Sequence, residues 1–323
     1  MRCSPKLSGE DDRDRHQAGW MVGTAPETPS RRRRFRHAMV AALTLALPTT
    51  GAPADGSAAD KAVGSVWVRD ALTVPGRSVT IEARLFEAGL LRDAGLGGEQ
   101  LELLVNGKPV ATAMTGGDGR AFFAYTPAMR GNHPLTVRLR TSKRVEGGRD
   151  GVATLACWER RRPILLVDLA TLVEPTPQSS RPFPSLPLEL GERTERAPVP
   201  DAADELKRLT RYYFNVVYLS RTGDPRLEQD DPRAWLRRHG FPVGFWVPLS
   251  AGSAALAVQI EEMRAAGWDN LKAGIGATKD FAEVLVAKRM QVLVLPASER
   301  DRDLPKKAQE VRSWKDVRTK LVH

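Results

Sequence analysis

The stretch Arg160-Arg161-Arg162-Pro163-Ile164-Leu165-Leu166-Val167-Asp168-Leu169-Ala170-Thr171 decides the fold. Its unbroken apolar run, Ile164 to Val167, lies between a basic segment with a proline and an aspartate. Such a run is typical of a strand that is buried on both faces of a parallel sheet. An aspartate at the carboxyl end of this strand lies where open α/β sheets bind their ligands. The stretch therefore predicts an α/β domain with Asp168 at its candidate site.

The chain after Asp168 alternates between helical and strand-like patterns, which predicts a doubly wound parallel sheet over residues 163–323. Asp201 is expected to cap the first helix, and Pro232 and Gly240 are expected at the start and end of the second. In order, we predict helix 202–209, strand 214–222, helix 232–240, helix 254–266, strand 271–276, helix 277–287, strand 290–296 as the last of the sheet, and helix 314–321.

A proline-rich loop, residues 174–200, follows the Asp168 strand. Its prolines are incompatible with a helix interior or a central strand. Two interpretations remain open for this loop. It shapes access to the site, as long loops in compact domains often do, or it wraps the sheet edge.

Residues 63–158 alternate apolar and polar positions in about seven short segments with turn signals between them, which predicts a β-sandwich. Asn106-Gly107 is a strong hairpin signal. Asp118, in a glycine-rich turn, is interpreted as a turn residue because no second carboxylate lies at the spacing of a calcium site. The predicted fold is therefore an all-β sandwich followed by an α/β domain.

The N-terminal segment predicts export. Arg31 to Arg34 precede an apolar core at 38–47 and an Ala52-Pro53-Ala54 end, which together are typical of a secretory signal peptide. The core is too short to span a membrane, which takes about 20 apolar residues. We therefore predict a leader and signal peptide over 1–54, a spacer over 55–62, a periplasmic or extracellular location, and no stable transmembrane span after cleavage.

Charge and cysteine content exclude some classes of protein. The net charge is +10, but part of it lies in the leader and no basic run with interleaved aromatics occurs, so a nucleic-acid partner is not expected. Cys3 lies in the leader, and Cys157 then has no partner for an intrachain disulfide. Cys157 is therefore expected to be a buried structural thiol.

Two motifs carry a resemblance to a known family. Asp168-Leu169-Ala170-Thr171 resembles the first motif of the haloacid-dehalogenase (HAD) superfamily, Asp-x-Asp-x-Thr. The segments 216–221 and 234–244, ending in Leu219-Ser220-Arg221 and in His-Gly-Phe-Pro-Val-Gly, resemble the lipin-type and actin-patch-type phosphatidate phosphatases. The resemblance implies Mg²⁺-dependent hydrolysis of a phosphate ester. It implies Asp168 as nucleophile, Ser220 with Arg221 and Thr222 as phosphate contacts, and Asp168, the Ala170 carbonyl and Asp280 as metal ligands.

The chain departs from this family pattern at several positions. Ala170 replaces the general acid, whose contribution is typically about 10²–10⁴-fold in rate. Residues 250–254 contain no basic residue where the family has its lysine, which leaves Lys272 and Lys279 as candidate substitutes. In the segment 276–281, Ala277 and Phe281 stand at the two acidic positions, and Asp280 is one residue short of the second.

Residues 115–121, Thr-Gly-Gly-Asp-Gly-Arg-Ala, together with the neighbouring turns resemble bacterial immunoglobulin-like domains, which act as spacers or adhesive elements. Three functions follow as hypotheses. The first is an exported HAD-like protein with impaired catalysis that binds a phosphorylated small molecule, a lipid head group or an envelope protein. The second is an active Mg²⁺-dependent phosphatase that uses Asp168. The third is an envelope adhesion or scaffold protein that acts through the sandwich.

Overall fold

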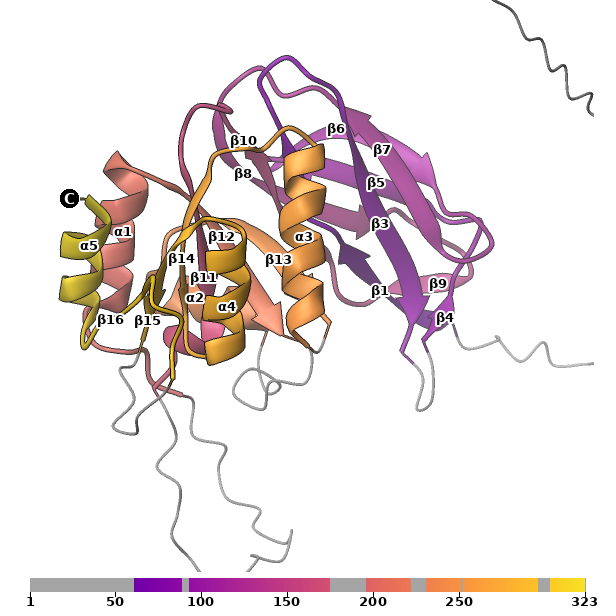
Figure 1. Ribbon diagram of the computed structural model, residues 1–323. Coiled ribbons are helices and arrows are strands. Elements are labelled where there is room, and N and C mark those ends of the chain that lie inside the picture. The colour runs from indigo at the N-terminus through magenta and orange to yellow at the C-terminus, as the bar shows by residue number, and fades with distance from the viewer. Residues whose placement is uncertain are drawn as a thin grey trace, which may run out of the picture. The chain divides into compact units, whose positions relative to one another are not determined.

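The predicted Asp168 strand forms β11 (Ile164–Asp168), in the interior of a six-stranded parallel sheet (Figure 1). The computed structural model describes residues 61–88, 93–174, 196–221, 231–250, 252–295 and 303–322. The predicted leader, residues 55–60 of the spacer, and most of the proline-rich loop lie outside these residues.

The order of the parallel sheet is β13-β12-β11-β14-β15-β16. Every neighbouring pair is parallel, and the order corresponds to the 3-2-1-4-5-6 arrangement of doubly wound folds. The strand order reverses between β11 and β14, so the carboxyl ends of these two strands border the crevice where such sheets bind ligands. Besides β11, the strands are β12 (Asn215–Arg221), β13 (Phe245–Leu249), β14 (Leu271–Gly276), β15 (Gln291–Val294) and β16 (Ala308–Glu310).

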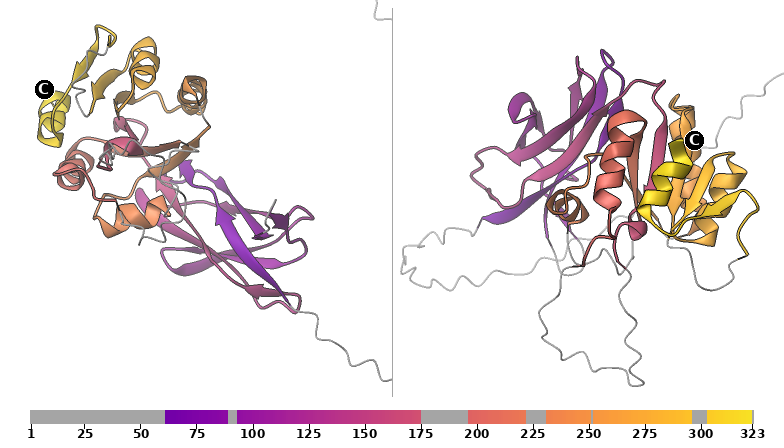
Figure 2. Two further views of the ribbon diagram at one scale, coloured as in Figure 1. Left: turned by 90° about the horizontal axis from the view of Figure 1, so that it is seen from below. Right: turned by 90° about the vertical axis from the view of Figure 1, so that its left-hand side faces the viewer.

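Helices cover both faces of the sheet, as Figure 1 shows, and Figure 2 shows α1 and α5 side by side. Within β11, Leu165 and Val167 pack on one face and Ile164 and Leu166 on the other, because side chains alternate along a strand. One face packs against α1 (Ala202–Tyr212), α2 (Pro232–Arg238) and α5 (Trp314–Val322), and the other against α3 (Ser253–Ala265) and α4 (Lys279–Ala287).

Three details differ from the sequence predictions. Strand β13 was not predicted, and it contains Pro248, which an edge strand tolerates because one side of its backbone pairs with no other strand. Strand β15 is not the last strand, since β16 continues the sheet. Asp201 is the N-cap residue of α1, as predicted, but its φ is 60° and its side chain makes no capping hydrogen bond.

Residues 62–157 form two five-stranded sheets around one apolar core, the architecture of immunoglobulin-like sandwiches. Asn106 and Gly107 both have positive φ in the hairpin that joins β5 to β6, as their sequence predicts. The short strands β2, β4 and β9 were not predicted. The strands are β1 (Ala62–Val68), β2 (Ala71–Thr73), β3 (Val79–Glu87), β4 (Ala94–Gly95), β5 (Gln100–Val105), β6 (Lys108–Met114), β7 (Arg120–Tyr125), β8 (Gly131–Leu139), β9 (Val145–Gly147) and β10 (Gly151–Cys157).

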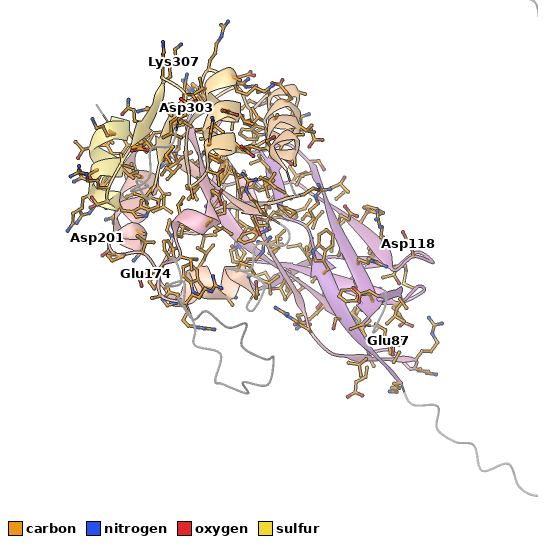
Figure 3. The ribbon with its side chains drawn as sticks, turned by 60° about the horizontal axis from the view of Figure 1, so that its bottom comes forward. Glu87, Asp118, Glu174, Asp201, Asp303 and Lys307 are labelled. Atoms are coloured by element: carbon orange, nitrogen blue, oxygen red, sulfur yellow. The ribbon has the colours of Figure 1, made fainter. Side chains whose placement is uncertain are left out.

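Two single-residue predictions concern the sandwich. Asp118 lies in an outlying turn (Figure 3), where its carboxylate accepts a hydrogen bond from the Arg120 amide at 3.1 Å, as expected of a turn residue. Cys157 is a buried free thiol, and burial raises its pKa above the usual value.

Asp70 joins the sandwich to the parallel sheet, both of which lie within one compact unit, residues 58–323. Its buried carboxylate accepts hydrogen bonds from the Thr154 amide at 2.8 Å and the Trp246 amide at 2.7 Å. The Arg233 guanidinium lies 2.7 Å from the same carboxylate. One side chain thus bonds to β10, to β13 and to the first turn of α2, which fixes the two layers to each other.

In the parts of the chain that the structure describes, there is no helix with both the length and the apolar character that a membrane crossing requires.

Candidate functional site

Asp168 ends β11 and begins the turn that follows. Its carboxylate accepts a hydrogen bond from the Ala170 amide at 3.1 Å and so caps the 3₁₀ turn Leu169–Thr171. The Thr171 hydroxyl donates to the Asp168 carbonyl at 2.7 Å, which closes the same turn. Asp168 is 2% exposed, so its charge is held in a largely dry environment.

A cation, Arg221, lies beside Asp168. Its Nε lies 3.6 Å from Asp168 Oδ2. Strand register explains this contact: Asp168 pairs with Leu219 on the neighbouring parallel strand, so Arg221, two residues on, has its side chain on the same face. The Ser220 side chain alternates to the opposite face. Of the predicted phosphate contacts, Arg221 therefore lies beside the predicted nucleophile and forms an ion pair with it.

The remaining predicted site residues lie on α4, on β14 and beyond the described ranges. Asp280 is exposed in the first turn of α4 and forms no hydrogen bond or ion pair with a described residue. Lys279 pairs with Glu283 and Asp303. Lys272 lies at the amino end of β14, four residues and thus about 13 Å along the strand from Gly276. Thr222 lies outside the described residues.

Among the described residues, no group of three His, Cys, Asp or Glu side chains converges at Asp168 or elsewhere. The two acidic positions of the family motif belong to the core instead. Ala277 is buried, and Phe281 packs so closely over Gly276 that a Cβ on this glycine would lie 2.2 Å from its ring. Packing between α4 and β14 therefore uses the positions that the family gives to metal ligands.

Trp314, which sequence reasoning did not connect with the site, supports the Asp168 turn. It is fully buried, and its Nε1 donates to the Thr171 carbonyl at 3.3 Å. Its indole packs in the core cluster that also contains Leu169 and Leu172. The C-terminal helix thus holds the turn in place.

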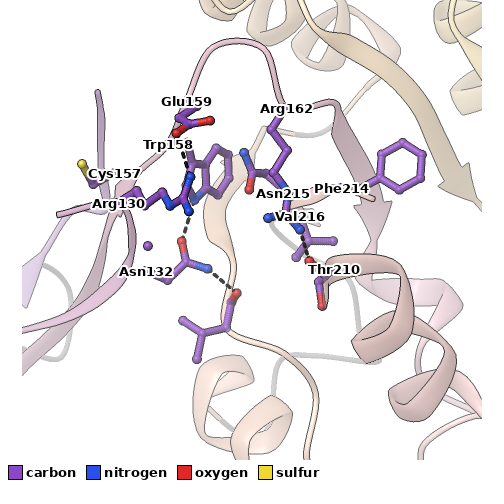
Figure 4. A pocket seen from close by; sticks show the side chains of 12 residues that line it. Arg130, Asn132, Cys157, Trp158, Glu159, Arg162, Thr210, Phe214, Asn215 and Val216 are labelled. Atoms are coloured by element: carbon purple, nitrogen blue, oxygen red, sulfur yellow. Dashed lines mark hydrogen bonds and ion pairs between the residues drawn. The ribbon is translucent and has the colours of Figure 1, made fainter. Parts of the chain in front are cut away.

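A second hollow lies at the amino end of the sheet, where the sandwich meets it (Figure 4). It has a volume of about 420 Å³ and includes Arg130, Trp158, Arg162 and Asn215 in its lining. Asn132 spans the junction: its side chain accepts from Trp158 Nε1 at 2.7 Å and donates to the Val243 carbonyl at 2.6 Å. Sequence reasoning did not connect Asn132 with a site, because the junction brings together residues from distant segments.

Comparisons with known proteins leave the family open. The sequence matches no protein-family model and no curated protein. Among solved structures, it is similar to the D0-D1 domain of intimin (15% identity, 29% of this chain, 47% of that chain, TM-score 0.23). It is also similar to the N-terminal Ig1-2 module of the Drosophila receptor protein tyrosine phosphatase DLAR (13% identity, 33% of this chain, 60% of that chain, TM-score 0.23). The chain spans less than two thirds of either match. The strand pairing of residues 62–157 shows the sandwich independently of these matches.

Proposed function

We propose that this chain is an exported binding protein whose HAD-like α/β domain no longer transfers phosphoryl groups. The observation that carries the proposal is the ion pair between Asp168 and Arg221 at 3.6 Å. The guanidinium is permanently charged and supplies the counter-charge of the aspartate. The site then serves to bind a phosphorylated or protein ligand at the carboxyl end of the sheet, and export rests on the signal-like pattern at 38–47.

The chemistry of the described residues agrees with impaired catalysis. A phosphoryl-accepting aspartate needs an acid to protonate the leaving oxygen, and residue 170 is an alanine. It also needs cations preorganised toward the transferring phosphoryl group. Arg221 is instead drawn to the aspartate, and Lys279 is drawn to carboxylates of its own helix and of residue 303.

The active phosphatase remains the rival hypothesis, with Asp168 as nucleophile, Ser220 as phosphate contact and Asp280 as metal ligand to Mg²⁺. A third hypothesis places function on the sandwich as an adhesion or scaffold module. It is favoured by the Asp70 junction, because a sandwich that is bonded to the sheet by a buried carboxylate can present a partner at a fixed orientation.

The test is phosphate release from p-nitrophenyl phosphate and phosphatidate in Mg²⁺. We expect wild type and Asp168→Asn to give the same rate, equal to the buffer blank, because the chain lacks a general acid at residue 170. A lipin-type phosphatase assayed in parallel shows that the conditions support turnover. Release by wild type that Asp168→Asn abolishes would establish the phosphatase and end the proposal.

A deletion separates the scaffold hypothesis from the binding proposal. If the sandwich alone carries partner binding, residues 58–158 expressed alone should retain the same envelope proteins as the whole chain. If the parallel sheet contributes, the isolated sandwich should lose them. Circular dichroism of the isolated sandwich first establishes that it folds.

A further inference from the structure

The hollow of Figure 4 continues into a second cavity of about 700 Å³, and the two share Asn132, Thr210 and Val243 in their linings. We call the combined feature the amino-end groove. It is bordered by the first strand residues of β12, the last turn of α1 and the edge of the sandwich. Its charged lining residues are the cations Arg130, Arg162, Lys207, Arg208 and Arg211 and the single carboxylate Glu159.

Two cations in the amino-end groove have no carboxylate partner among the described residues. The Arg162 guanidinium donates to the Thr210 carbonyl, which leaves its charge uncompensated. The Arg211 guanidinium lies over the Tyr212 ring at 5.9 Å from the ring centre. The remaining three cations pair with Glu159, Asp204 and Glu205. The groove therefore keeps a net positive charge.

The lining also contains an unused donor. The side-chain amide nitrogen of Asn215 is buried, and no residue in the described ranges accepts a hydrogen bond from it. In Figure 4, Arg130 and Arg162 approach the hollow from opposite sides, with Trp158 between them. A concave site with guanidinium groups on facing walls matches an oxyanion that offers several acceptor oxygens.

We propose that the amino-end groove binds the phosphate group of a ligand. A phosphate monoester carries close to two negative charges and three terminal oxygens. It therefore matches two uncompensated guanidinium groups better than a ligand with one carboxylate group would. The volume lies in the usual range for small-molecule sites, and junctions between layers are a common place for them. This site is separate from Asp168, which lies at the opposite, carboxyl end of β11.

The phosphate group could belong to a soluble ester or to a lipid head group, and the test distinguishes these sources. One arm is calorimetric titration of the protein with inorganic phosphate and with glycerol 3-phosphate. The other arm is cosedimentation with phosphatidylcholine vesicles, with and without phosphatidate, whose head group is a phosphate monoester. Each arm is repeated with Arg162→Ala, with Arg211→Ala, and with Arg77→Ala, which removes the same charge from an exposed turn of the sandwich.

We expect binding in at least one arm, weakened about tenfold by Arg162→Ala and by Arg211→Ala, since each variant removes a charge-assisted hydrogen bond. Arg77→Ala should change the affinity by less than about twofold, because isolated surface charges contribute little. Arg211 is exposed, so its variant tests the site even if Arg162→Ala unfolds. No binding in either arm would overturn the proposal. It would also fall if the Arg211 variant bound like wild type, or if all variants lost affinity equally.

Discussion

Asp70→Ala is expected to lower the free energy of unfolding by about 3–5 kcal/mol, because it removes the buried partner of a half-buried cation and the acceptor of two amides. The variant strips the Arg233 guanidinium of its carboxylate and leaves the amides of Thr154 and Trp246 without an acceptor. These donors belong to the sandwich and to the parallel sheet, so both layers lose an anchor at once. Urea unfolding followed by circular dichroism measures the loss.

The matched control is Asp204→Ala, which removes an exposed carboxylate whose pairing with Lys207 should be worth about 0–1 kcal/mol.

The stability contribution of Asp70 should also depend on pH. Burial raises the pKa of its carboxyl above 3.8, even though the Arg233 guanidinium and the two amides act in the opposite direction. Because the folded pKa exceeds the unfolded one, this contribution to the free energy of unfolding falls as pH rises from 3.8 through the folded pKa. Asp70→Ala should lack this part of the pH dependence, and an unchanged profile would contradict the role given to Asp70.

Trp314→Ala is expected to cost about 3–5 kcal/mol, the usual range for deleting a fully buried large aromatic side chain. Its indole is completely enclosed between α5 and the sheet, and its Nε1 holds the carbonyl of Thr171, three residues after Asp168. The loss should therefore loosen the turn that Asp168 caps as well as the core. Thermal unfolding measures the stability, and hydrogen exchange at the Ala170 amide reports on the turn.

Trp67→Ala serves as the control for Trp314, since the Trp67 side chain is 46% exposed and its removal should change stability by less than about 0.5 kcal/mol. Trp314→Phe keeps most of the packed volume and loses the hydrogen bond, so its cost should lie between the two. Equal costs for Trp314→Ala and Trp67→Ala would contradict the assignment of Trp314 to the core that supports the Asp168 turn.

The main elements of the fold could be predicted from the sequence because their patterns are local. The apolar run before Asp168 predicts a buried strand. Asn106-Gly107 predicts a hairpin because both residues adopt positive φ readily. The edge strands β13 and β16 could not be predicted in this way. Strand β13 contains Pro248, which argues against a strand in the sequence pattern. Strand β16 has only three residues, and it is recognisable only from its pairing with β15.

The candidate site also has features that the local sequence predicts and features that depend on tertiary contacts. The replacements at Ala170, Ala277 and Phe281 are visible in the sequence, because each is a change of residue type at a fixed spacing. The role of Arg221 is not visible, because it depends on the register between β11 and β12 and on the alternation that turns Ser220 away. The amino-end groove depends on contacts between segments that lie apart in the sequence, as the bond between Asn132 and Val243, 111 positions apart, illustrates.

The most direct test of the account is a double-mutant cycle between Asp168 and Arg221. The free energies of unfolding of Asp168→Asn, Arg221→Met and the double variant are compared with wild type in urea. If Arg221 is the resident counter-ion of Asp168, the two positions should be coupled by about 1–3 kcal/mol, and the double variant should be less destabilised than the sum of the single variants. Additive effects, combined with Mg²⁺ that stabilises wild type but not Asp168→Asn, would show a metal-binding nucleophile site and contradict the account.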